Sequence, residues 1–292
     1  MFVIKLLSRL PFGILYALSD FLFLVSYRVV KYRRKLVWKN LKNSFPTTSD
    51  TALRAIEKEF YKNLCDYAVE LVKLLTIPKE ELASRVKFVN PEVLIDFLNK
   101  EQSVLCLASH QFNWEWLLTA GSIVLPEQMD FVYQPVHSKF ADDFSYACRT
   151  RFGAHGIKRD NVAREVIKRR NILRKIALVG DQYPGHGNDK RYSTTFMHQP
   201  TVFFSGLNQL ASLTQYPVVY FAMRKVNRGY YETKVVLLAN PPYEKESTDI
   251  IKPYADAVEK VIHADPAGWL WSHNRWKTRH LKIDDAVKEG SD

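Results

Sequence analysis

Cysteine, glycine and proline are all scarce in this chain of 292 residues. The three cysteines, Cys65, Cys106 and Cys148, include no CxxC pair and cannot form a disulfide framework, which indicates a reducing compartment. Eleven glycines and 13 prolines are too few for a collagen-like or low-complexity chain. Because 47% of the residues are hydrophobic, the chain can bury a large core, which excludes an intrinsically disordered protein.

Several motifs that identify common enzyme classes are also missing from the sequence. Neither GxGxxG nor GxxxxGK[ST] occurs, so there is no dinucleotide or P-loop fingerprint. There is no GxSxG elbow of a serine hydrolase, and no HExxH or supporting Cys/His pair that would indicate zinc. We therefore expect neither a metal nor a cofactor.

Acidic residues are outnumbered by basic ones, 31 to 42, which leaves a formal net charge of +11. Such an excess favours a polyanionic partner, and charge alone leaves three classes open: nucleic acid, an anionic membrane surface, or an acidic protein.

Residues 2–30 form a long apolar stretch, FVIKLLSRLPFGILYALSDFLFLVSYRVV, followed directly by the basic run of residues 31–35. The 17 residues from Pro11 to Tyr27 would span about 26 Å as a helix, against about 30 Å of hydrocarbon. Asp20 would cost roughly 2.5–3.5 kcal/mol there, so an interfacial anchor fits at least as well as a spanning helix. A buried amphipathic helix is the alternative, and a cleaved signal peptide is less favoured. The basic run predicts that the remaining chain is cytosolic.

The remaining chain reads first as helices and then as alternating strands and helices. Helical spacing covers residues 32–45 and 50–75. The strands that we predict are residues 87–89, 103–108, 130–134, 176–179, 218–223 and 231–238. The helices that we predict between them are residues 91–99, 114–124, 139–151, 162–170 and 203–213. This alternation predicts an α/β fold with a mixed, largely parallel sheet flanked by helices, whose last two strands pair antiparallel.

This pattern predicts four segments of the chain. They are an N-terminal membrane anchor (1–30), a helical extension (31–85), an α/β domain (86–280) and a polar tail (281–292).

The segment SVLCLASHQFNWEWLLTAGSIV (103–124) is the most informative for chemistry. His110 follows a buried strand and Glu115 lies in the first turn of the next helix, at the kind of strand end where ligand sites form. With Glu115 orienting the imidazole, His110 would serve as a general base. A histidine that only caps a helix, beside a solvated glutamate, is the alternative, and HX4E alone does not exclude it.

Other polar residues admit both a functional and an ordinary reading. Asp181 and Gln182 end another apolar strand, on the same sheet edge as His110 if the two strands are parallel, although the glycine-rich stretch after them suits a surface loop. Arg149 and Arg151 suit either phosphate binding or a helix C-terminus. Glu70 lies late in the helix of residues 50–75. The sequence favours a solvated residue on the flank of that helix over one that supports the site.

The C-terminal WLWSHNRWKTRH interleaves tryptophans with cations. Such a pattern suits nucleic-acid stacking, a membrane interface or plain core packing.

Seven segments in order resemble the lipid A biosynthesis lauroyl/myristoyl acyltransferases of Gram-negative inner membranes. They are YRRKLVWKNLKNSFP (32–46), FYKNLCDYAVEL (60–71), SHQFNWEW (109–116) with HX4D/E in its glutamate form, FVYQPV with RTRFG (131–136 and 149–153, counted as one), GDQ (180–182), residues 196–206, and WLWSHNRWK. One departure is Gln134, where the family usually has arginine, and the loop of residues 183–195 is longer and more polar than in many members.

The resemblance implies a glycerolphosphate-acyltransferase-like fold and an O-acyltransferase on the cytoplasmic face of the bacterial inner membrane. A fatty acyl chain would pass from an acyl carrier protein thioester, a co-substrate, to a hydroxyl of a lipid A precursor. The resemblance implies His110 as the general base and Glu115 as its partner. It also implies five residues at the acceptor or supporting the site: Asn113, Arg149, Arg151, Asp181 and Gln182.

Two other functions remain open on the sequence. The acceptor could be another lipid, such as a lysophospholipid or an aminoacyl lipid. A non-catalytic basic protein that binds membranes or nucleic acid is a weaker alternative, because the basic residues are scattered along the chain, and we expect no nucleic-acid partner.

Overall fold

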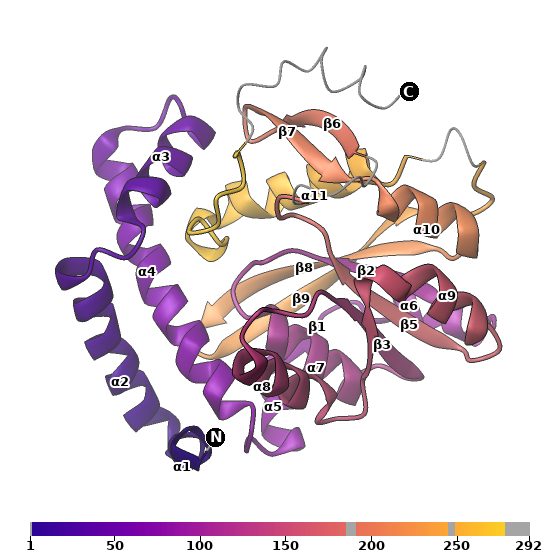
Figure 1. Ribbon diagram of the computed structural model, residues 1–292, viewed down its shortest axis with the longest axis horizontal. Coiled ribbons are helices and arrows are strands. Elements are labelled where there is room, and N and C mark those ends of the chain that lie inside the picture. The colour runs from indigo at the N-terminus through magenta and orange to yellow at the C-terminus, as the bar shows by residue number, and fades with distance from the viewer. Residues whose placement is uncertain (1, 185–190, 245–248, 278–292) are drawn as a thin grey trace.

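The computed structural model is an α/β structure built around a seven-stranded sheet, and it describes residues 2–184, 191–244 and 249–277 (Figure 1). The strand order is β1-β9-β8-β2-β5-β3-β4. The strands are β1 (Val86–Phe88), β2 (Val104–Ala108), β3 (Gln128–Tyr133), β4 (His155–Lys158), β5 (Arg174–Val179), β8 (Val218–Asn227) and β9 (Tyr230–Ala239). Neighbouring strands are parallel except β8 and β9, which confirms the predicted mixed, largely parallel sheet.

Helices cover both faces of this sheet, which is why its central strand is apolar throughout. All five residues of β2 are buried, and their side chains alternate between two hydrophobic cores. One face packs against α5 (Lys79–Arg85), α6 (Glu92–Asn99), α7 (Trp114–Val124) and α8 (Lys139–Thr150). The other packs against α9 (Val162–Lys168), α10 (Gly206–Thr214) and α11 (Ile251–Ala264).

A β-hairpin and the C-terminal segment complete the second core. The hairpin is formed by β6 (Arg191–Phe196) and β7 (Gln199–Phe204), and it lies near α11 (Figure 1). After α11, the chain turns through the short helix η3 (Pro266–Gly268) and runs back over the sheet edge. Trp269, Trp271 and Trp276 of this segment are all buried in the core. The plain core-packing interpretation of these tryptophans is therefore correct, and they offer no exposed surface for stacking bases.

The N-terminal helices lie against α4 (Asp50–Lys73), at the side of the α/β core, and α3 (Arg34–Ser44) precedes α4 (Figure 1). They are α1 (Phe2–Ser8) and α2 (Phe12–Leu24), which continues as the π-helical turn η1 (Val25–Val29). Residues 12–29 are long and apolar enough to cross a membrane, and 11% of that stretch is buried.

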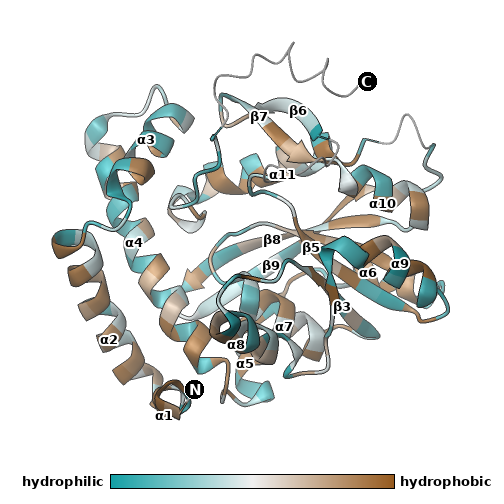
Figure 2. Ribbon diagram, in the orientation of Figure 1, coloured by the Kyte–Doolittle hydropathy of each residue, from teal (hydrophilic) through white to brown (hydrophobic). Residues whose placement is uncertain are grey.

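The two sides of α2 differ in what they contact. Leu15, Ser19 and Phe23 are buried, whereas Phe21 and Leu24 are 60% and 48% exposed. Figure 2 shows the hydrophobic colour along most of α1 and α2. The helix is therefore docked on the domain by one side and presents an unpartnered apolar side on the other. The division of the chain into four segments stays a prediction, and its polar tail lies outside the described residues.

Candidate active site

The pairing of β2 with β5 brings His110 and Asp181 together. Ala108 at the end of β2 pairs with Val179 at the end of β5, and the two strands are parallel. His110 and Asp181 each lie two residues beyond that pair, so both leave the sheet at the same edge. The predicted proximity of these two strand ends is confirmed.

Asp181 holds both the backbone and the ring of His110. One carboxylate oxygen, Oδ1, lies 2.7 Å from Nδ1 of His110, and Oδ2 accepts the backbone N–H of His110 at 2.9 Å. The indole N–H of Trp269 also donates to Oδ2, at 2.7 Å. Burial alone would raise the pKa of Asp181, but the charge of His110 and these hydrogen bonds outweigh it and hold that pKa below its usual value. A buried, ionised carboxylate at Nδ1 leaves Nε2 as the ring nitrogen for chemistry.

The direct hydrogen bond expected between Glu115 and His110 is not what the structure has. Both oxygens of Glu115 instead accept from Arg149 of α8, Oε2 from Nε at 2.8 Å and Oε1 from Nη2 at 2.6 Å. Trp114 donates to Oε1 as well, at 3.2 Å. The reason is topological: Asp181 reaches the imidazole from the adjacent strand, while α8 places a guanidinium over the first turn of α7. The carboxylate that orients the ring is therefore Asp181.

The loop that carries His110 is braced by the C-terminal segment. Phe112 has a left-handed backbone (φ 48°), its N–H donates to the carbonyl of Gly268 at 2.8 Å, and its ring covers that glycine. A side chain at Gly268 would place a Cβ 2.5 Å from the Phe112 ring, so only glycine fits. Leu270 donates in turn to the carbonyl of His110 at 3.0 Å. This loop is thus held on both sides of Gln111.

Asn113 and Arg151 take structural positions. Asn113 is fully buried and caps α7, where its Oδ1 accepts the backbone N–H of Trp116 at 2.9 Å. Arg151 donates from Nη1 to the carbonyls of Leu74 and Ile77, at 2.7 and 2.6 Å, and so ties the end of α8 to the end of α4. Both residues lie outside the described lining of the cavity beside His110, and their predicted contact with substrate stays a prediction.

A cavity of about 680 Å³ opens beside the imidazole. His110, Glu115, Arg149 and Gln182 line it, so four of the predicted site residues face one space. The rest of its wall is largely apolar and comes from β2, α7, β3, β5, α9 and α10: Ala108, Leu117, Leu118, Met129, Val132, Ala163, Ala177, Leu178, Leu207, Leu210 and Leu213. A cavity of this size and lining suits a flexible apolar ligand with a polar head beside His110.

Two residues near the imidazole were named from the sequence only as part of the C-terminal pattern of tryptophans and cations, and not as site residues. Trp269 fixes Asp181, and His273 accepts the backbone N–H of Tyr183 at its Nε2, at 3.2 Å. Burial lowers the pKa of His273 to about 4, so this second histidine stays neutral. Both belong to the WLWSHNRWK block, which was the available signal. Within the described residues, no group of histidine, cysteine, aspartate and glutamate side chains could hold a metal.

The fold and the site define a class of protein: an α/β protein with a His–Asp pair at the edge of a parallel sheet, next to an apolar cavity. Residues 1–278 match the family described as bacterial lipid A biosynthesis acyltransferase, and the chain belongs to that family. It is also 24% identical over 282 residues to the lipid A biosynthesis lauroyltransferase of Escherichia coli (strain K12), covering 95% of this chain and 90% of the relative. The resemblance stated on the seven sequence segments is confirmed, as is the class of acyltransferases of lipid A biosynthesis.

Proposed function

We propose that this protein transfers a fatty acyl chain from an acyl carrier protein thioester to a hydroxyl of a lipid A precursor, with His110 as the general base. The observation that carries the proposal is the imidazole held at Nδ1 by the buried Asp181, on the wall of a cavity of about 680 Å³. A neutral imidazole so oriented takes a proton at Nε2, and the apolar wall accommodates an acyl chain.

The proposed reaction needs no covalent acyl-enzyme. Nε2 of His110 removes the proton of the acceptor hydroxyl as its oxygen attacks the thioester carbonyl. Asp181 stabilises the imidazolium that forms, because a buried carboxylate lies 2.7 Å from Nδ1. Collapse of the tetrahedral intermediate breaks the C–S bond, and the leaving sulfur takes the proton back from the imidazolium. The products are an ester and a free thiol.

Arg149 is the residue that we propose for the negative charge of the tetrahedral intermediate. Its guanidinium is held by two hydrogen bonds to Glu115, and it lines the same cavity as His110. Burial alone would lower the pKa of Arg149, but the hydrogen bonds and charge of Glu115 outweigh it and raise that pKa, so the cation is permanent. A pre-positioned cation stabilises developing charge without reorganising. Glu115 then acts by orienting Arg149 rather than His110.

We further propose that α1, α2 and η1 bind the membrane in its interface, on the cytoplasmic face of the bacterial inner membrane. One side of α2 is occupied by the domain, and the apolar side chains on the other side include Phe21 and Leu24. Asp20 pairs with Arg228, at 2.7 Å, rather than facing hydrocarbon. The basic residues 31–35 follow directly, where they can meet anionic lipid.

The test is incubation of the purified protein with acyl thioesters of carrier protein and of coenzyme A, each with a lipid A precursor, a lysophospholipid or an aminoacyl lipid. Mass spectrometry should find an acyl ester on the lipid A precursor with the carrier-protein donor, and none with His110→Ala. Acylation of another lipid alone would overturn the proposed acceptor. Near-native transfer by His110→Ala would overturn the proposed base.

A further inference from the structure

A carboxyl group outside the cavity, that of Glu70 on α4, joins three separate parts of the chain. Glu70 is fully buried, which makes the solvated-flank interpretation of its sequence position wrong. Its Oε2 accepts from Asn113 Nδ2 and from the Tyr231 hydroxyl, both at 2.8 Å. Its Oε1 accepts from the hydroxyl of Tyr16 on α2, at 3.0 Å. A buried carboxyl with three donors is fixed in place, and it fixes those donors in return.

The contact with Asn113 reaches the residues of the proposed chemistry. Asn113 lies between His110 and Glu115 in the sequence, and it caps the helix that carries Glu115. The backbone of Glu70 binds the same turn, because its carbonyl accepts the indole N–H of Trp116 at 3.0 Å. Side chain and backbone of one residue therefore hold the start of α7 against α4.

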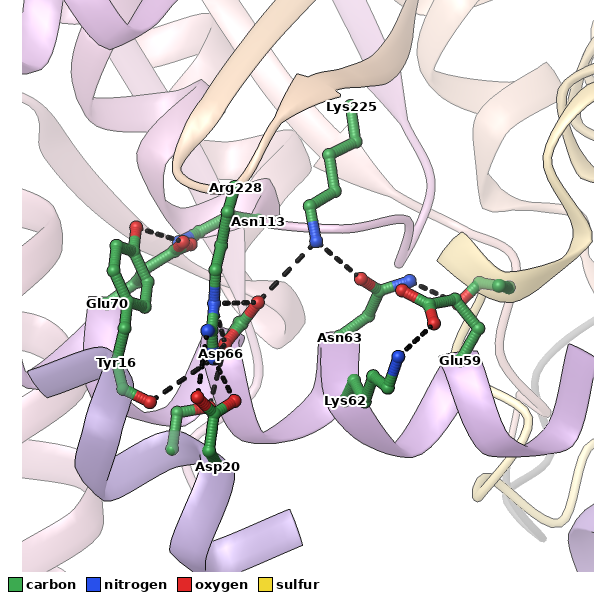
Figure 3. Close-up of polar contacts among 12 residues, drawn as sticks. Tyr16, Asp20, Glu59, Lys62, Asn63, Asp66, Glu70, Asn113, Lys225 and Arg228 are labelled. Carbon is green, nitrogen blue, oxygen red and sulfur yellow. Dashed lines mark hydrogen bonds and ion pairs between the residues drawn. The ribbon is translucent and has the colours of Figure 1, made fainter.

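The contact with Tyr16 extends this support to the N-terminal helix. Figure 3 shows Tyr16 and Asp20 of α2 facing α4 and the turn between β8 and β9. Arg228 in that turn donates to Asp66 of α4 at 2.6 Å and to Asp20 at 2.7 Å. A further interhelical hydrogen bond runs from Ser19 to Asp66, at 2.7 Å. Among these contacts of α2, the hydrogen bond from Tyr16 to Glu70 is the one whose acceptor also binds Asn113, at the start of α7.

We propose that Glu70 is a positioning residue for acyl transfer, and that Tyr16 makes the N-terminal helix part of the support of the active site. The inference rests on the proposed roles of His110 and Arg149. Reacting groups displaced by about 1 Å lose up to about 100-fold in rate, so a loosened α7 start slows the chemical step. The helix then contributes to turnover as well as to membrane binding. It does so even when both substrates are dispersed in detergent, with no bilayer present.

The experiment compares two variants that each remove one interhelical hydrogen bond from α2. Tyr16→Phe removes the hydroxyl bound to Glu70 and keeps the ring that packs on Phe12 and Arg228. Ser19→Ala is the matched control. It removes the hydroxyl bound to Asp66, whose other partner described above, Arg228, lies in the turn between β8 and β9 and not on α7. Both full-length proteins are assayed in detergent with acyl carrier protein thioester and a lipid A precursor. We measure kcat, the KM of each substrate, and Tm.

We expect both variants to lower Tm by about 2–4 °C, because each loses one hydrogen bond to a buried carboxyl group. Tyr16→Phe should lower kcat about tenfold with both KM values within about twofold of wild type, and Ser19→Ala should leave kcat within about twofold. Glu70→Leu, which removes the acceptor of the Asn113 amide and of the Tyr16 hydroxyl, should lower kcat by at least the factor expected for Tyr16→Phe. In the Tyr16→Phe/Glu70→Leu double variant, kcat should fall little below that of Glu70→Leu, because both substitutions act through the same chain of contacts.

Equal kcat values for Tyr16→Phe and Ser19→Ala would overturn the positioning role, since the two hydrogen bonds would then be merely structural. A loss expressed only in KM would overturn it as well. The wild-type and His110→Ala proteins, assayed alongside, separate this result from the proposed function. Absence of transfer by wild type, or its survival in His110→Ala, would instead contradict the function itself.

Discussion

Replacing Asp181 by asparagine tests which carboxylate orients the imidazole. The shape of the side chain is kept, but the two donors that converge on Oδ2, the backbone N–H of His110 and the indole N–H of Trp269, admit only an oxygen there. The amide nitrogen of asparagine must therefore face Nδ1 of His110. An amide donor at that place requires Nδ1 to be the unprotonated ring nitrogen, which moves the proton to Nε2.

A histidine protonated at Nε2 cannot take the proton of the acceptor hydroxyl. General-base catalysis contributes about 10²–10⁴-fold, so kcat of Asp181→Asn should fall by that factor, equivalent to about 3–5 kcal/mol of activation free energy. Folding stability should change much less, because the isosteric side chain keeps both hydrogen bonds at the Oδ2 position. The measurement is kcat for acyl transfer in detergent, with Tm as the control for folding.

Glu115→Gln provides the comparison within the same site. If Asp181 orients the imidazole, Glu115→Gln loses activity only through a less firmly held Arg149, and its kcat should stay above that of Asp181→Asn. An Asp181→Asn enzyme within threefold of wild type, or a Glu115→Gln enzyme that is the weaker of the two, would refute this reasoning.

Three further predictions concern Arg149, Glu70 and the apolar side of α2. Arg149→Lys keeps the positive charge but loses the two hydrogen bonds with Glu115. The kcat for acyl transfer should therefore fall about 10–100-fold. An unchanged kcat would count against Arg149 as the residue that stabilises the oxyanion. Burial raises the pKa of Glu70 from 4.5 to about 7, so between these pH values the folded chain keeps a proton that the unfolded chain loses. The titration of Glu70 should therefore lower the free energy of unfolding by about 3 kcal/mol from pH 4.5 to 8. Denaturant titrations at several pH values measure this loss, which Glu70→Gln should not show. If the free energy of unfolding depended on pH equally in wild type and Glu70→Gln, the prediction would be contradicted. Phe21→Ser/Leu24→Ser removes two exposed apolar side chains of α2. Binding to anionic vesicles, measured by flotation, should weaken about 100-fold or more, while kcat in detergent stays unchanged. Undiminished flotation would argue against an α2 that lies in the membrane interface.

Local sequence patterns predicted most strands of the sheet and the sheet edge at which His110 and Asp181 meet. Short apolar runs marked β2, β5, β8 and β9. All of β2 is buried, as are the first residues of β5 and β8, whereas β9 alternates between buried and more exposed residues. Parallel pairing then followed from the helices between them, and it placed His110 and Asp181 at one edge. The strands β4, β6 and β7 and the helices α5 and α11 were missed. The hairpin β6–β7 was missed because β6 carries the polar run Ser-Thr-Thr, and α11 was missed although its buried residues recur at helical spacing.

The partners of the charged residues were decided by the tertiary structure alone. Glu115 is five residues from His110, yet it binds Arg149, while Asp181 reaches the imidazole from 71 residues away. Sequence distance is a poor guide here, because hydrogen bonds form between whichever groups packing brings within about 3 Å. Glu70 shows the same limit: its place on the helix was readable, but not that α2, α7 and β9 would close over it. Periodicity and apolar runs are properties of a segment and can be read from it. Burial and pairing belong to the assembled chain, and only the assembled chain reveals them.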